Sequence, residues 1–164
     1  MSGRPRPPAD PREHGFRLAW TSNAIMWSYA ARRLLRSGHH TDAQLGFVAF
    51  YFCVKLTSQL VNGRRSPMVP ADLTARGDCP VARRRLRALA DRLRGFRNGI
   101  LHWSDNFEEG SAIATHWTAG SMVLETSTGG SSATLTREEV EALLDRLEPW
   151  LARHYQRLLE ARPD

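Results

Sequence analysis

The chain of 164 residues has few cysteines, one lysine and no long apolar run. Its two cysteines are Cys53, in an apolar stretch, and Cys79, just before Pro80, which is neither a disulfide framework nor a zinc-ligand pattern. No apolar stretch reaches the roughly 18 residues of a membrane span, and no apolar segment follows the N-terminal charges. We therefore expect two reduced thiols, no membrane span, no signal peptide and a cytoplasmic location.

Metal ligands in a recognisable spacing are also missing. The chain has six histidines, but His39, His40, His116 and His154 show neither an H-E-x-x-H nor a paired C-x2-C pattern. We interpret them as loop, strand and helix residues, and we expect no metal and no cofactor.

Basic charge is abundant, and it comes almost entirely from arginine. The chain has 23 basic and 17 acidic residues, a net charge of +6, and Lys55 is its only lysine. A guanidinium group holds phosphate with a fixed fork of donors, and a basic protein attracts polyanions. Nucleic acid is therefore the first partner to expect.

Apolar residues recur with a helical period over the first part of the chain. Residues 1–12 hold four prolines and three arginines and predict a disordered arm, so the folded domain should span residues 13–162. The first helix should end near Gly38, and Asp42 is a candidate N-cap for the second. The second helix is apolar nearly all round, which predicts a place in the middle of a bundle or in a dimer interface.

Two further helices are predicted nearer the C-terminus. The third should start at Pro80, with an apolar stripe and several arginines on its other faces. Thr136 and Glu139 form a capping box for the last helix, in which Pro149 predicts a kink or a division. Residues 111–126 predict a β-hairpin, and the Ser/Thr/Gly cluster after them a loop. The expected fold class is mainly α, a four-helix up-and-down bundle with this hairpin inserted before the last helix.

The candidate catalytic residues are Arg97, Asn98 and His102, which close the arginine-rich third helix. Arginine binds phosphate, and histidine can act as acid or base near neutral pH. This R-x4-H segment in its helical context resembles the R-x4-6-H signature of HEPN domains. The resemblance implies an up-and-down helical bundle and a homodimer in which two motifs form one composite RNA-cutting site.

The resemblance also implies a function and a mechanism. It implies a metal-independent endoribonuclease of toxin or phage-defence type, with RNA as substrate and a cognate antitoxin as a further partner. His102 would transfer protons, Arg97 would hold the scissile phosphate, and Asn98 would orient the histidine or the substrate. Attack by the 2′-hydroxyl would leave a 2′,3′-cyclic phosphate.

Helical geometry restricts how the motif can act. At about 100° per residue, Arg97 lies about 20° from Leu86 and borders the apolar stripe, whereas His102 lies about 160° away in an unbroken helix. A loosening or end of the helix near Gly99, or a second subunit, is needed to bring them together. The alternatives left open are a solvated Arg97 with a capping His102, and a non-catalytic helical module that binds nucleic acid, nucleotide or a partner protein.

Overall fold

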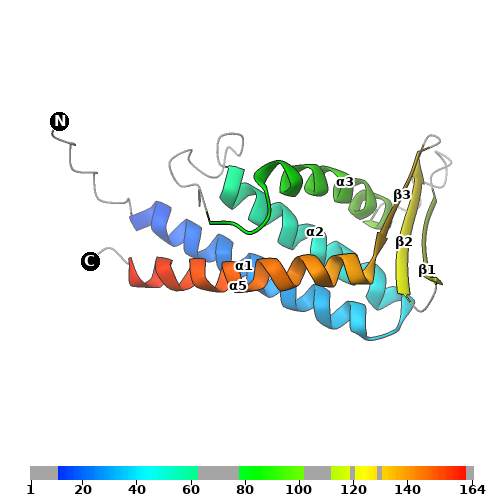
Figure 1. Ribbon diagram of the computed structural model, residues 1–164, viewed down its shortest axis with the longest axis horizontal. Helices are drawn as coiled ribbons and strands as arrows, with labels where there is room; N and C mark the ends of the chain where they lie inside the picture. Colours follow the sequence, from blue (N-terminus) through cyan, green and yellow to red (C-terminus); the bar gives the residue numbers. More distant parts are fainter. Residues whose placement is uncertain (1–10, 63–77, 102–111, 119–120, 129–130, 162–164) are drawn as a thin grey trace.

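A computed structural model describes residues 11–62, 78–101, 112–118, 121–128 and 131–161. The described chain is mainly α-helical, as predicted. Four long helices lie along one axis, and a small β-sheet stands across one end of them (Figure 1). Along the chain the four helices run alternately in opposite directions (Figure 1).

Helices α1 (Pro11–Arg36) and α2 (His40–Asn62) form an antiparallel pair. The tight turn between them contains Gly38, whose φ of 80° favours glycine. The pair packs closely further along: a Cβ on Gly46 would lie 2.8 Å from Cγ of Leu35. The end predicted for the first helix is confirmed, but the predicted cap is wrong, because α2 begins at His40 and Asp42 lies inside its first turn.

Helix α2 is the central helix, with α1 on one side and α3 (Arg83–Leu101) on the other. Its residues Phe47, Phe50 and Val54 are among the most buried in the described chain. The span His40–Val61 is long and apolar enough to cross a membrane, but 67% of its apolar window is buried inside the protein. Burial to this extent is what the core helix of a bundle shows.

Helix α5 (Arg137–Glu160) packs against α1. The predicted capping box is confirmed, since Thr136 Oγ1 accepts from the backbone N–H of Glu139 (3.1 Å) and Glu139 Oε2 accepts from that of Thr136 (2.8 Å). The helix continues through Pro149, so a division there is wrong. Pro149 is exposed, and the carbonyl that loses its partner can bind water.

Helix α3 packs on α2 and helix α5 packs on α1, but α3 and α5 scarcely contact each other. Around the bundle the order is therefore α3, α2, α1 and α5, with the fourth side open. The segment before α3 bridges this side, because the guanidinium of Arg146 on α5 donates to the carbonyl of Pro80.

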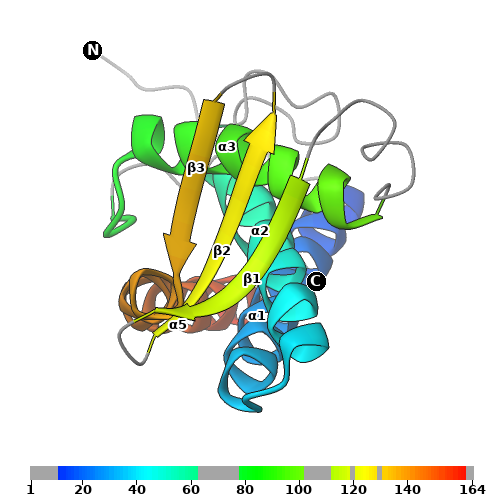
Figure 2. The ribbon, with the colours of Figure 1, turned by 90° about the vertical axis from the view of Figure 1, so that its right-hand side faces the viewer.

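The sheet is antiparallel and has three strands, β1 (Ala112–Thr118), β2 (Ser121–Thr128) and β3 (Ser131–Thr136), in the order β1-β2-β3 (Figure 2). The predicted two-stranded hairpin therefore lacks a strand. The loop predicted after it is wrong, because residues Ser131–Thr136 form β3. The polar β3 pairs along its whole length with β2, where Leu135 lies opposite Leu124. Strand β3 leads directly into α5 and fixes the start of that helix.

Candidate functional site

Arg97 lies on α3, on the side of the helix that faces α2. Leu86 and Leu93 on the same side are fully buried, and Arg97 is half-buried beside them. Its guanidinium carbon lies 5.6 Å from the ring centre of Tyr51 on α2. The predicted position of Arg97, at the border of the apolar stripe, is confirmed.

The contact with Tyr51 leaves Arg97 with unused hydrogen-bonding capacity. Its Nε is buried and has no hydrogen-bond partner within the described residues. No carboxylate in the described part of the chain forms an ion pair with it either. Among the described residues the aromatic ring is the only group that contacts this half-buried guanidinium, so within that part of the chain no carboxylate neutralises its charge.

Tyr51 connects Arg97 to other side chains of α2 and α1. The Nζ of Lys55, the only lysine, is also 5.6 Å from the Tyr51 ring centre. The Tyr51 ring meets that of Phe52 edge to face at 5.2 Å, and Phe52 stacks on Trp27 of α1 at 5.0 Å. A continuous row of aromatic rings therefore leads from α1 across α2 to Arg97.

The outer part of this row is exposed to solvent. Trp27 is 38% exposed, and Leu45, about two turns of α2 before Phe52, is 45% exposed, while Phe52 and Leu56 are half-buried. We call Trp27, Leu45, Phe52 and Leu56 the aromatic face. It is an apolar surface on α1 and α2 that ends at two cations, Lys55 and Arg97, and such surfaces commonly mark sites of association.

The other two predicted catalytic residues are placed less completely. Asn98 follows Arg97 within α3, and its side chain is not among the described ones. His102 lies outside the described residues, so the meeting of Arg97 and His102 stays a prediction. Helix α3 is continuous through Gly99 as far as Leu101, so within the described part of α3 there is no break near Gly99.

A polar cluster between α5 and the segment before α3 was not foreseen from the sequence. The indole N–H of the fully buried Trp150 donates to Asp78 Oδ1 at 3.0 Å, and Arg157 pairs with the other carboxylate oxygen. The hydrogen bond from Trp150, together with Arg157, lowers the pKa of Asp78. This cluster attaches the start of the α3 segment to α5 and is a structural feature rather than a reactive one.

His154 belongs to the same region and is buried in α5, as an amphipathic-helix residue. Its ring is parallel to that of Trp150, with the centres 5.4 Å apart, and its Nε2 has no partner among the described residues. Burial and the nearby Arg157 lower its pKa. The only sign of this stack in the sequence is the i, i+4 spacing of an aromatic residue and a histidine.

The described cysteines do not supply a nucleophile. Both are free, and burial raises the pKa of the Cys53 thiol to about 12, so its reactive thiolate is scarce at neutral pH. Within the described residues no group of three or more His, Cys, Asp or Glu side chains could hold a metal ion.

Similarity to known proteins adds nothing to this description of the site. Comparisons with protein-family models, with curated proteins and with solved structures find no match to this chain.

Proposed function

We propose that this chain is a cytoplasmic, metal-independent endoribonuclease of HEPN type that acts as a homodimer. The observation that carries the proposal is the environment of Arg97: a half-buried guanidinium on the Tyr51 ring, with no partner for its Nε among the described residues, five residues before a histidine. Four helices in alternating directions are the frame that the R-x4-H resemblance implies.

The aromatic face supports the dimeric form of the proposal. It borders Arg97, and a second copy that packed on it would bring its own α3 end close to the first. Two Arg97 side chains and two His102 side chains could then surround one RNA phosphate. In such a dimer, Arg97 of one subunit could meet His102 of the other. The two residues of one subunit would then not need to lie on the same side of one continuous helix.

The mechanism needs only groups of the chain and of the RNA. His102 takes the proton of the 2′-hydroxyl, whose oxygen attacks the adjacent phosphorus. A histidine returns a proton to the departing 5′-oxygen. Arg97 donates to the phosphate oxygens, where negative charge increases in the transition state, and Asn98 orients the histidine or the substrate. The products are a 2′,3′-cyclic phosphate and a 5′-hydroxyl end.

The test is cleavage of RNA by the purified protein in excess EDTA. Arg97→Ala and His102→Ala should each lower the rate by about 10²–10³-fold or more, the usual effect of losing one transition-state donor. Arg87→Ala is the matched control, because Arg87 is an exposed arginine on the same helix, and it should cleave at the wild-type rate. Equal rates for all four proteins would contradict the proposal and favour a non-catalytic binding module.

As an active ribonuclease the protein would be harmful to its own cell. We therefore expect a role as a toxin or phage-defence effector, restrained by a cognate antitoxin. Expression of the wild-type chain should slow growth, and expression of His102→Ala should not. Equal growth with the two proteins would remove this part of the proposal.

A further inference from the structure

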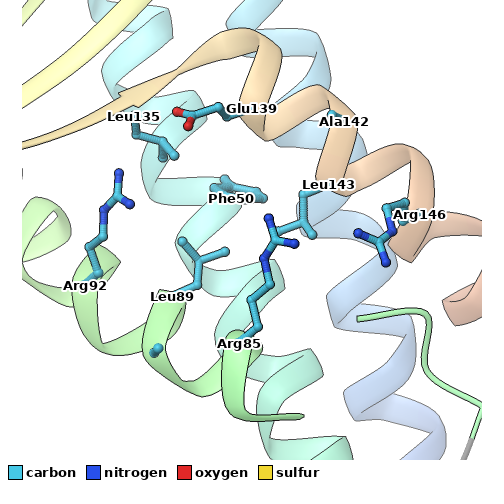
Figure 3. A pocket seen from close by; sticks show the side chains of 10 residues that line it. Phe50, Arg85, Leu89, Arg92, Leu135, Glu139, Ala142, Leu143 and Arg146 are labelled. Atoms are coloured by element: carbon cyan, nitrogen blue, oxygen red, sulfur yellow. The ribbon is translucent and has the colours of Figure 1, made fainter. Parts of the chain in front are cut away.

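The open side of the bundle, between α3 and α5, contains a cleft that is separate from Arg97. Its volume is about 430 Å³, within the range of small-molecule sites, which is roughly 300–1,000 Å³. Figure 3 shows Phe50 of α2 at its floor, with Leu89 of α3 and Leu143 of α5 on either side. The cleft exists because α3 and α5 both pack on their other neighbours and scarcely contact each other above the buried Phe50.

The rim of the cleft is strongly basic. Arg85 and Arg92 come from α3 and Arg146 from α5, and the one acidic lining residue is Glu139 (Figure 3). Glu139 already accepts the backbone N–H of Thr136 in the capping box. Three guanidinium groups therefore face one carboxylate that is engaged elsewhere, which leaves an excess of positive charge for a ligand.

Two of the three arginines also define the length of the cleft. Arg92 donates to the carbonyl of Thr134 on β3, and Arg146 donates to the carbonyl of Pro80. Both bonds cross the open side, one toward the sheet and one at the start of the α3 segment. Carbonyl groups do not neutralise the guanidinium charge, so these bonds position two cations without cancelling them.

Arg85 lies between these two bonds and is the arginine best placed to hold a ligand. Figure 3 shows its guanidinium reaching from α3 toward Leu143, across the cleft. It forms no ion pair or hydrogen bond with any other described residue. Within the described part of the chain its fork of donors is therefore available for a phosphate, which it can bind through two parallel bonds.

The ligand must match both the charge and the apolar floor. An anion without an apolar part would use the basic rim alone and leave the apolar lining around the half-buried Leu89, above the buried Phe50, without a contact. A compact, flat group attached to a phosphate satisfies both conditions. We propose that this cleft binds a phosphorylated nucleoside, either a free nucleotide or the phosphorylated end of an RNA strand.

Titration calorimetry on the full chain tests this with AMP, ADP, adenosine and inorganic phosphate. AMP or ADP should bind, and adenosine and inorganic phosphate should each bind at least about tenfold more weakly, because each makes only half of the contacts. Arg85→Ala should weaken AMP binding by about tenfold or more, and Arg87→Ala, a neighbouring exposed arginine outside the cleft, should not.

Two further measurements are needed. One distinguishes a free nucleotide from the end of an RNA strand, and the other tests the cleft independently of the proposed ribonuclease activity. A 5′-phosphorylated RNA dinucleotide that binds more tightly than AMP identifies a strand end, and the reverse order identifies a free nucleotide; both orders support the site. Arg97→Ala should bind AMP like the wild type whether or not the chain cleaves RNA. Absence of AMP and ADP binding, equal affinity for AMP and inorganic phosphate, or an Arg85→Ala variant with unchanged affinity would overturn the inference.

Discussion

The guanidinium of Arg97 lies over the ring of Tyr51, with its central carbon 5.6 Å from the ring centre, and Tyr51 is 2% exposed. The ring thus belongs to the core and fixes the position of a cation at the edge of the core. A catalytic cation acts best when it is held in place before the substrate arrives. Tyr51 is therefore a positioning residue for Arg97 in the proposed reaction.

Two substitutions at Tyr51 should distinguish the contribution of its aromatic ring from that of its hydroxyl group. Tyr51→Phe keeps the aromatic contact and should cleave RNA at close to the wild-type rate. Tyr51→Leu loses a cation–π contact of about 0.5–2 kcal/mol and should cleave about two- to thirtyfold more slowly, with a larger effect on kcat than on KM. Circular dichroism on both variants checks the fold. Equal kcat values for Tyr51→Leu and the wild type would show that Tyr51 does not position Arg97 for the reaction.

The aromatic face should be the dimer interface. Trp27→Glu places a charge where apolar contact is expected, so the protein should elute with the mass of one chain in size-exclusion chromatography with light scattering, whereas the wild type should elute as a dimer. RNA cleavage should fall together with dimer content.

Tyr29 offers the matched control for this experiment. It is 61% exposed and lies about 160° around α1 from Trp27, so Tyr29→Glu adds the same charge away from the aromatic face. That variant should stay dimeric and active. A wild-type protein that is monomeric at assay concentrations, yet active, would contradict the composite site.

Asp78 should contribute to stability through Trp150. Asp78→Ala leaves the buried indole N–H without its acceptor, which should lower the free energy of unfolding by about 1–3 kcal/mol in urea titrations. Asp91→Ala is the control: its ion pair with Arg94 joins two side chains about 60% exposed, and its loss should cost under about 0.5 kcal/mol. Equal losses for the two variants would show that the Trp150 bond contributes no more than a surface ion pair.

His154 should make the protein less stable in mild acid. Burial and Arg157, with Arg17, lower its pKa in the folded chain, and Asp78 only partly opposes them. As the pH falls below about 6.5, the unfolded chain takes up a proton that the folded chain resists, so the free energy of unfolding falls with pH. Between pH 7.5 and 5.5, His154→Phe should show a shallower decline than the wild type, because it keeps the stack on Trp150 and cannot titrate.

The two proteins are compared by chemical denaturation at the same series of pH values. Identical slopes for His154→Phe and the wild type would mean that His154 is not the group responsible.

The helices could be predicted from the sequence because three of them carry an apolar stripe with a helical period and the fourth, α2, is apolar nearly all round over a helical length. The capping box at Thr136 and the border position of Arg97 followed from local spacing for the same reason. Strand β3 could not be predicted, since its run of Ser, Thr and Ala has little apolar alternation and becomes a strand by pairing with β2.

The residues that contact Arg97, and those that line the cleft, could not be predicted from local sequence patterns either. Tyr51 lies 46 residues before Arg97, and its role depends on how α2 and α3 pack. The cleft exists because α3 and α5 do not pack on each other. The apolar periodicity of a helix shows which of its faces is buried but not which helices stay apart. Arg85, Arg92 and Arg146 belong to the cleft only because α3 and α5 stay apart.

The most direct test of the central claim is the chemistry of the RNA ends. The purified dimer, in excess EDTA, should convert a single-stranded RNA into fragments that end in 2′,3′-cyclic phosphate, identified by mass spectrometry, and should leave DNA of the same sequence intact. Arg97→Ala should yield none of these fragments. Cleavage of the DNA as well as the RNA, RNA fragments with other ends, or unchanged cleavage by Arg97→Ala would contradict a reaction that uses the 2′-hydroxyl and depends on Arg97.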